Sequence, residues 1–347
     1  MSSVGPESAV PATAQIPVIN VSQIDTETAD RLVDAAARFG FIFIELESTN
    51  IDYNSVQHMF QLSKKFFGSP RAEKEKCAIS ENNKGWSSML SETLDPENQT
   101  RGDFKEALNF GEFKDGRAQQ PVPDSLIADE STLNDFFASC HTLCVRLLQL
   151  FAMGLKIDEE AGGKDWFSSR HDMSGPSGSI LRLLHYPIIP SDANYVPGKD
   201  IRAGAHSDYG SITLLFQRPG QEGLEILSKG WQPVPVHPES VDTSRPPPIL
   251  VNIGDLLSYW TGGYLKSTIH RVVVPPSASL SGEDRYSMAF FCHPVDTALL
   301  VPVPSEFLQE HGKKRGAMAE SAESQGKIIT AAEHLKGRLA ATYGWKK

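Results

Sequence analysis

The sequence predicts a mainly β protein whose core is a β-sandwich or jelly roll, with helices before and after that core. The main observation is that short β-rich runs alternate with Gly- and Pro-rich turns after about residue 175. The second is that helical periodicity occurs before these runs and returns only near the C-terminus. Strands spaced so closely are typical of a sandwich or jelly roll and not of a parallel α/β sheet. The β-rich runs are residues 179–186, 211–217, 224–227, 249–253, 268–274 and 286–292.

The part of the chain before these runs is predicted to be mostly helical. Its strongest helix carries apolar residues at i, i+3, i+4 and i+7 along its whole length. The segment 81–125, which precedes this helix, is rich in turn residues and charge. The elements expected here are a short strand at 16–19, a helix ending at Gly40, a buried strand at 41–44, and helices at 56–67 and 133–155.

The chain is expected to fold as one cooperative unit, in which the helical N-terminal part wraps onto the β core. The first fifteen residues are rich in Ser, Ala and Pro, which predicts a flexible tail. Helical pattern returns at 328–341. The expected divisions are a tail at 1–15, a mostly helical region at 16–175 packed on the core, the jelly-roll core at 176–300 and a C-terminal helical extension at 301–347.

Composition excludes several classes of protein. The 347 residues carry a formal net charge of −10, which argues against nucleic acid or an anionic membrane surface as the main partner. No apolar run approaches the ~20 residues of a membrane span, and the N-terminus lacks the pattern of a signal peptide. The 4 cysteines are too scattered for a disulfide scaffold. We therefore expect a cytoplasmic protein with no evident obligate protein partner.

The strongest chemical signal is a His-x-Asp pair followed by a distant histidine. His206 and Asp208 lie just before the β-rich run 211–217, and alternate residues of a strand face the same side. His270 lies on a later predicted strand. Two imidazoles and one carboxylate leave half of an octahedron open, which is the ligand set of non-haem Fe(II) oxygenases. Zinc with a bound water takes a similar set, so the metal stays open at this point.

Two other clusters are weaker candidates for a metal site. His237 and Glu239 have the same spacing, but two neighbouring prolines disrupt a regular strand there. Cys140 and Cys144 lie one helical turn apart on the most apolar helix, which is typical of core packing.

An arginine beyond the third candidate ligand is suited to bind a carboxylate. Arg285 and Ser287 face the same side of a predicted strand and offer a guanidinium fork and a hydroxyl. Tyr186, on an earlier strand, would add a phenol to the same anion. Taken alone, the arginine is more typical of a surface Arg and the tyrosine of a core Tyr. Their order along the chain favours an anion site beside the metal.

These motifs together resemble those of the Fe(II)/2-oxoglutarate-dependent oxygenases of the isopenicillin N synthase-like branch. The resemblance spans most of the chain. The segments that resemble family motifs, in the order in which the family has them, are residues 16–20 with 39–43, the "DxKE" segment at 103–106, the "HTDxGxxT" segment at 206–213, and residues 252–255, 260–271 and 285–287. One departure is visible. The common "NYYP" segment is Leu-His-Tyr-Pro at 184–187, so a co-substrate contact from that Asn is absent. His185, in place of the first Tyr, is interpreted as a packing variation.

The resemblance implies a double-stranded β-helix (jelly-roll) core flanked by N-terminal and C-terminal helices. It also implies Fe(II) as the metal, with 2-oxoglutarate and O2 as co-substrates. The enzyme would oxidise a small molecule by hydroxylation, desaturation or ring rearrangement, with release of succinate and CO2, in specialised metabolism. The residues matched in this way are His206, Asp208 and His270 as catalytic iron ligands, and Arg285, Ser287 and Tyr186 as the 2-oxoglutarate site.

Further family-like positions suggest a substrate pocket. Phe291 and His293 alternate on one face after the arginine motif, and Trp86 lies in a Gly-aromatic segment. Each aromatic residue is equally typical of the core, but several of them together would suit a small aromatic or polyketide-like substrate. The candidates are Trp86, Phe104, Lys105, Phe110, Phe291 and His293.

Three alternatives stay open. Isopenicillin N synthase and aminocyclopropane-carboxylate oxidase keep a similar Arg-x-Ser without using 2-oxoglutarate, so an iron oxidase of that kind is one. A non-catalytic jelly-roll binding module with a vestigial triad is the second. A zinc-dependent hydrolase is the third, and it would leave Arg285 and Ser287 unexplained.

Overall fold

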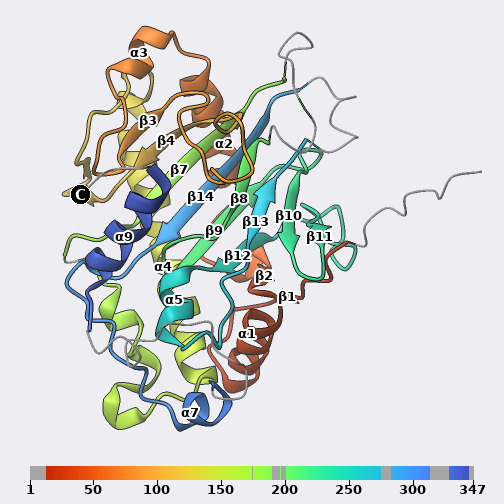
Figure 1. The fold of residues 1–347 in the computed structure, drawn as a ribbon, viewed down its shortest axis with the longest axis vertical. Coiled ribbons are helices and arrows are strands. Elements are labelled where there is room, and N and C mark those ends of the chain that lie inside the picture. Colours follow the sequence, from red (N-terminus) through yellow and green to blue (C-terminus); the bar gives the residue numbers. More distant parts are fainter. Residues whose placement is uncertain are drawn as a thin grey trace, which may run out of the picture.

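Two β-sheets face each other at the centre of the protein (Figure 1). The computed structural model describes residues 13–173, 175–189, 196, 201–274, 283–312 and 328–343. The larger sheet has the strand order β1-β2-β12-β9-β14-β7-β4-β3, and the smaller sheet β11-β10-β13-β8. The jelly-roll arrangement predicted from the β-rich runs is confirmed, without a closed barrel.

The larger sheet is built from β1 (Val18–Ile19), β2 (Phe41–Ile44), β12 (Ile249–Ile253), β9 (Ile212–Gln217), β14 (Arg285–Cys292), β7 (Ile180–Tyr186), β4 (Glu106–Phe110) and β3 (Gly85–Ser87). The smaller sheet is built from β11 (Trp231–Pro233), β10 (Leu224–Leu227), β13 (His270–Val272) and β8 (Ala203–His206). A separate hairpin pairs β5 (Phe113–Lys114) with β6 (Arg117–Ala118). The helices are α1 (Thr26–Phe39), α2 (Tyr53–Phe67), α3 (Arg71–Glu75), α4 (Glu130–Gly154), α5 (Asp255–Trp260), α7 (Glu306–Gly312) and α9 (Ala331–Tyr343).

The larger sheet is buried on both faces, and alternate residues of its strands serve two different cores. Ile42 and Ile44 of β2 pack with helices α1, α2 and α4 in one hydrophobic cluster. Phe41 and Phe43 lie in a second cluster that joins the two sheets. This explains why 41–44 is apolar without alternation, as the sequence indicated for a fully buried strand. β7 and β14 divide their residues between the same two clusters.

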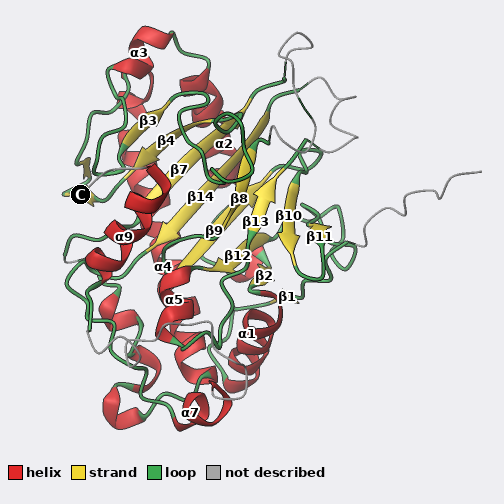
Figure 2. Ribbon diagram, viewed as in Figure 1, coloured by secondary structure: helices red, strands yellow, loops and turns green. Residues whose placement is uncertain are grey.

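Local signals set the boundaries of α1. The carboxylate of Asp25 accepts a hydrogen bond of 2.8 Å from the amide of Thr28 and caps the first turn. Gly40 ends the helix with a left-handed φ of 71°. A Cβ at Gly40 would lie 2.3 Å from the hydroxyl of Thr268, so the position requires glycine on two counts. Figure 2 shows the helices around the central strands.

The N-terminal region differs from the expected helical layer, because it also supplies strands to both edges of the larger sheet. β1 and β2 extend one edge, and β4 and β3 extend the other. The sequence did not predict β4, because this strand is buried on both faces and combines Glu, Ala, Leu, Asn and Phe. Its apolar and polar residues therefore show no alternation. β8 was missed because a four-residue strand containing Gly and Ala has little β signature.

The two chain ends also refine the expected divisions. Of the predicted tail, residues 1–12 lie outside the described residues. Ala14 is buried, and its amide donates a 3.0 Å hydrogen bond to the carbonyl of Pro233, so the packed chain begins before residue 15. At the other end, α7 and α9 are described, while residues 313–327 between them are not.

One helical stretch, Asp124–Gly154, is long and apolar enough to cross a membrane by length and composition alone. It contains α4, and 61% of its most apolar window is buried inside the protein. Leu147, Leu148 and Phe151 of α4 are fully buried in the main core. The apolar character of α4 is thus accounted for by packing against the sheet and α1.

Candidate active site

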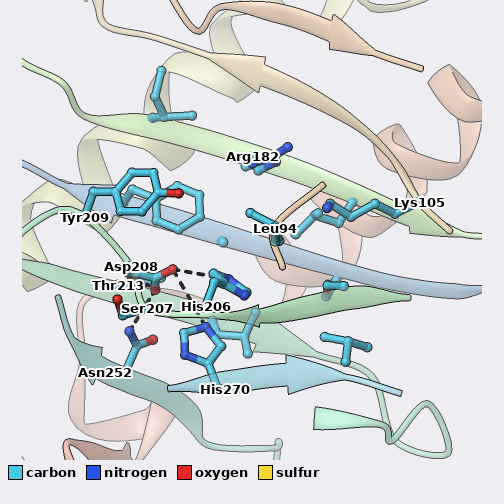
Figure 3. A pocket seen from close by; sticks show the side chains of 18 of the residues that line it. Leu94, Lys105, Arg182, His206, Ser207, Asp208, Tyr209, Thr213, Asn252 and His270 are labelled. Carbon is cyan, nitrogen blue, oxygen red and sulfur yellow. Dashed lines mark hydrogen bonds and ion pairs between the residues drawn. The ribbon is translucent and has the colours of Figure 1, made fainter. Parts of the chain in front are cut away.

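The smaller sheet brings the two candidate histidines together. β8 and β13 are antiparallel neighbours, and His206 pairs directly with His270 across them. Asp208 follows β8 by two residues, beyond the end of the strand. The three side chains converge at the wall of one cavity between the sheets (Figure 3). His206 and Asp208 thus face the same cavity, as their spacing predicted, and the register between β8 and β13 brings His270 beside them.

The donor atoms of these residues are close enough to share one ion. Nε2 of His206 and Nε2 of His270 each lie 3.7 Å from Oδ1 of Asp208. All three donor atoms lie within 4.8 Å of one another. The imidazole rings of His206 and His270 have centroids 4.3 Å apart.

Backbone carbonyls fix which ring nitrogen of each histidine faces the cavity. Nδ1 of His206 donates to the carbonyl of Gly204 at 2.8 Å, and Nδ1 of His270 donates to that of Thr268 at 3.1 Å. Both Nε2 atoms then face the cavity, where the neutral form of each ring offers a lone pair. Burial and the neighbouring His270 lower the pKa of His206 to about 4, so its ring is neutral near pH 7.

The carboxylate of Asp208 is held by two hydrogen bonds from the larger sheet. Oδ2 accepts from the hydroxyl of Thr213 on β9 at 2.6 Å and from the amide of Asn252 on β12 at 2.7 Å. Burial raises the pKa of Asp208, but the two histidines and these hydrogen bonds outweigh it and hold the pKa below its usual range. Oδ1 is left to face the imidazoles. Two imidazoles and one carboxylate with fixed orientations fit a divalent metal, and the open half of the set suits Fe(II) with co-substrates.

Arg285, Ser287 and Tyr186 also lie on the cavity wall, with side chains exposed by 3% or less. β14 pairs with β7 so that Arg285 lies opposite Tyr186, and the guanidinium carbon is 4.8 Å from the Tyr186 ring centroid. Arg285 donates to the hydroxyl of Ser287 at 3.2 Å and to the side-chain carbonyl of Gln217 at 3.3 Å. Its Nε donates to the carbonyl of Gln221 at 2.9 Å, so these three hydrogen bonds of the guanidinium go to neutral acceptors. A buried cation held by neutral acceptors is suited to receive an anion.

The predicted substrate residues divide into two groups. Lys105, Phe291 and His293 line the cavity, whereas Trp86, Phe104 and Phe110 do not. Strand alternation explains part of this division. Phe110 shares the outer face of β4 with Glu106 and packs on Phe113, with ring centroids 6.3 Å apart.

The contacts of Trp86 and Phe104 explain why these residues lie outside the cavity lining. Trp86 points to the outer side of the larger sheet, where its Nε1 donates to Glu106 at 2.8 Å. Phe104 lies under the guanidinium of Arg101, whose carbon is 5.0 Å from the ring centroid. Neither residue lines the cavity.

Several cavity residues were not singled out from the sequence. Arg182 and Leu184 share the cavity face of β7 with Tyr186, a signal that alternation from Tyr186 would have provided. Asn83, Leu94 and Tyr209 come from loops, and Leu335 and Leu339 from one face of α9. The loop and α9 residues carry no motif, because only packing brings them to the cavity.

The cations on the far wall of the cavity are ion-paired. Lys105 contacts Asp103 and lies 3.1 Å from Oε2 of Glu92, and Arg182 contacts Oε1 of the same Glu92. Burial lowers the pKa of Lys105, but these carboxylates outweigh it and hold the pKa above its usual range. Figure 3 shows Lys105 and Arg182 on the side of the cavity away from His206 and His270.

Comparison with known proteins identifies the architecture. Residues 177–294 match the 2OG-Fe(II) oxygenase superfamily, and residues 16–128 match the family of the N-terminal region of non-haem dioxygenases in morphine synthesis. UPF0676 protein C1494.01 of Schizosaccharomyces pombe is 34% identical, over 95% of this chain and 94% of its own. The 2-oxoglutarate-dependent dioxygenase frbA of a Dothideomycetidae species is 30% identical, over 88% of each chain.

A solved structure agrees with these sequence matches. A full-length protein of Neurospora crassa, solved in complex with alpha-KG (2-oxoglutarate) and thymine, superposes with a TM-score of 0.74 at 31% identity, over 96% of this chain and 99% of its own. These relatives favour use of 2-oxoglutarate over an iron oxidase that lacks it and over a non-catalytic module. Fe(II) and 2-oxoglutarate are thus the cofactor and co-substrate expected from the sequence. The chain belongs to the 2-oxoglutarate-Fe(II) oxygenase superfamily and is a non-haem Fe(II)- and 2-oxoglutarate-dependent oxygenase.

Proposed function

We propose that His206, Asp208 and His270 hold the Fe(II) through Nε2, Oδ1 and Nε2. The observation that carries this proposal is the convergence of the three donor atoms at the cavity that Arg285 also enters. The bonds from Thr213 and Asn252 keep Asp208 turned toward the two imidazoles. With 2-oxoglutarate and O2, iron in such a site supplies the oxidant for a substrate C–H bond, and 2-oxoglutarate leaves as succinate and CO2.

In the same proposal, Arg285 and Ser287 bind the distal carboxylate of 2-oxoglutarate, with Tyr186 beside them. A buried guanidinium fork suits a carboxylate because it offers parallel donors in a site of low dielectric constant. Gln217 accepts one guanidinium N–H, which fixes the plane of the fork toward Ser287. Leu184 faces the same cavity and adds no hydrogen-bonding group, as the departure from the family pattern led us to expect.

For the substrate, we propose a small planar heterocycle with ring carbonyls, of the pyrimidine type. Phe291 and Tyr209 offer aromatic surfaces in the cavity, and the side chains of Asn83 and Arg182 offer hydrogen-bond donors to carbonyl oxygens. Similarity to the Neurospora crassa protein, which was solved with thymine and with 5-formyluracil, supports this choice. The cavity volume of about 130 Å³ agrees with a small molecule.

We propose that residues 176–300 carry this chemistry and that the flanking segments 16–175 and 301–347 brace the core and shape the pocket. We also propose that the enzyme works in the cytoplasm. Cys77, Cys140, Cys144 and Cys292 are all buried and unpaired, which agrees with a reducing compartment.

The metal and co-substrate assignments are tested by anaerobic titration. Adding 2-oxoglutarate to the protein with Fe(II) should produce the visible charge-transfer absorption of a chelated 2-oxo acid. His206→Ala and Asp208→Ala should lose it, while His237→Ala, which alters the rival His-x-Glu pair, should keep it. A His206→Ala protein with the full absorption would refute the proposed ligand set.

The substrate class is tested by succinate formation with a panel of ring compounds. Thymine, uracil and 5-formyluracil should stimulate succinate release above the substrate-free rate, and a saturated amino acid such as proline should not. Phe291→Ala should lower the response to the active pyrimidine. Stimulation by proline alone would contradict the proposed class while leaving the oxygenase assignment intact.

A further inference from the structure

His185 lies on the face of β7 that points away from the cavity, directly behind the proposed co-substrate site. Its register partners are Glu106 on β4 and Tyr286 on β14. The next residue along β7, Tyr186, is paired with Arg285 on the cavity side. His185 is therefore adjacent to the co-substrate residues without touching the cavity.

Both ring nitrogens of His185 meet carboxylates. Nδ1 lies 2.9 Å from Oε1 of Glu106, and Nε2 lies 3.0 Å from Oδ2 of Asp284. An ionised carboxylate only accepts hydrogen bonds, so both contacts are favourable only when both nitrogens carry protons. A neutral ring would point one nitrogen lone pair at a carboxylate. The geometry therefore fits an imidazolium that bridges two acids on opposite sides.

A lysine joins the cluster of ionisable groups around His185. Nζ of Lys74 lies 3.2 Å from both carboxylate oxygens of Glu106. Lys74, Glu106 and His185 are each less than 10% exposed. Loss of a hydrogen bond between groups so buried leaves a polar atom without a partner, which is costly.

The surroundings of His185 include its two acidic partners, a stacked tyrosine ring and several cations. Burial raises the pKa of both Glu106 and Asp284, but hydrogen bonds, among them those from His185, hold each pKa below its usual range. The Tyr286 ring stacks on His185 with centroids 4.8 Å apart and an interplanar angle of 19°. Charged or titratable groups that face the cluster from packed elements are Lys74 on α3, Lys64 on α2, Tyr286 on β14, Arg202 before β8 and Arg218 after β9.

The bond from His185 to Asp284 bears on Arg285, because Asp284 directly precedes it. The other oxygen of Asp284 accepts a 2.9 Å bond from the amide of Ile188. The side-chain amide of Gln221 donates to the carbonyl of Asp284 at 3.0 Å, and the carbonyl of Gln221 accepts from Nε of Arg285 at 2.9 Å. The start of β14 is thus tied to β7 through Asp284 and to the segment after β9 through Gln221.

We propose that His185 is a positioning residue for 2-oxoglutarate: its charged ring holds Asp284 against β7 and so fixes Arg285 for the distal carboxylate. The proposal rests on the role of Arg285 proposed above. It gives His185 a role beyond the packing variation expected from the sequence, because the tyrosine of the family pattern has one oxygen and cannot bridge two acids.

His185→Phe keeps an aromatic ring for the stack on Tyr286 and removes both hydrogen bonds. In the anaerobic titration of the full-length Fe(II) protein, we expect its Kd for 2-oxoglutarate to be about threefold to tenfold higher than that of the wild type. At saturating 2-oxoglutarate the rate of succinate formation should change by less than about twofold. The same substitution at exposed His58 on α2 is the matched control and should change neither value.

Equal Kd values for His185→Phe and the wild type would overturn the proposal. Arg285→Leu separates this failure from that of the co-substrate site. If Arg285→Leu binds 2-oxoglutarate normally, the proposed site is wrong. If it loses binding while His185→Phe does not, only the positioning role fails. Should His185→Phe not fold, Asp284→Asn removes the charge at the other end of the bond and should raise the Kd in the same direction.

Discussion

The hydroxyl of Thr213 offers a direct test of how the protein holds the metal ligand Asp208. This hydroxyl donates to Oδ2 of Asp208 at 2.6 Å, and Asn252 donates to the same oxygen at 2.7 Å. Thr213→Val keeps the branched shape on β9 and removes the hydrogen bond alone. The carboxylate would keep one of its two hydrogen bonds in a site where it is only 6% exposed.

The expected magnitude follows from that geometry. A hydrogen bond to a buried charge contributes about 1.5–3 kcal/mol, which is roughly a 10- to 100-fold change in an equilibrium constant. Loss of the bond also favours protonation of Asp208, and a proton competes with the metal. We therefore expect Fe(II) affinity to fall by about 10- to 100-fold, in line with outer-shell substitutions at metal sites.

The assay is anaerobic competition for Fe(II) with a coloured chelator, followed by absorbance. Thr213→Ser keeps the hydroxyl and loses only a methyl group, so it is the matched control and should bind Fe(II) nearly as the wild type does. Thermal unfolding of the metal-free variants checks that both fold. If Thr213→Val binds Fe(II) within twofold of the wild type, Asp208 is not oriented through this bond and the reasoning is refuted.

Other predictions address the co-substrate, the metal, acid stability and the C-terminal helix. Arg285→Leu should raise the KM for 2-oxoglutarate by about 100-fold in a succinate assay, because a buried ion pair is lost; an unchanged KM would contradict the site. Removing the metal by chelation should lower the Tm measured by calorimetry, whereas Asp208→Ala should show little metal-dependent shift. Burial lowers the pKa of the His171 imidazole to about 4, against an unfolded value near 6.5. As the pH falls, the imidazole of the unfolded chain is protonated before that of the folded protein. The free energy of unfolding is therefore at its full value above about pH 6.5 and falls by up to about 3 kcal/mol toward pH 4. Urea unfolding at pH 7 and pH 5 should show a smaller decrease in this free energy for His171→Gln than for the wild type. Arg338 on α9 forms an ion pair with Asp255 at 2.6 Å and contacts the hydroxyl of Ser207. Arg338→Met should weaken the packing of α9 against the cavity and raise the ratio of succinate to oxidised product. Exposed Lys336→Met on the same helix should not, and equal ratios for the two variants would argue against a role for Arg338.

Much of the β core could be predicted because its strands are signalled locally. The runs at 179–186, 211–217 and 286–292 correspond to β7, β9 and β14 with boundaries that differ by one residue. β3 and β4 were not predicted, because their place at the edge of the larger sheet depends on pairing with β7. A short strand with mixed composition is defined by the neighbour it pairs with, and that neighbour lies far away in the sequence.

The same distinction applies to the cavity. The aromatic character of Trp86 and Phe110 suggested a substrate wall, but their strand faces direct them to the outer core. Leu335 and Leu339 line the cavity because α9 packs there, and nothing near them in the sequence indicates it. A side chain's neighbours depend on register and on helix docking, which a single sequence does not display.

The sequence by itself determined which functional residues share one side of a strand. His206 with Asp208, and Arg285 with Ser287, share a side because a strand repeats every two residues. Only the tertiary structure decided that β13 places His270 opposite His206, that Thr213 and Asn252 orient Asp208, and that His185 bridges two acids behind Arg285. These contacts join strands far apart in the chain, so their geometry exists only once both sheets have formed.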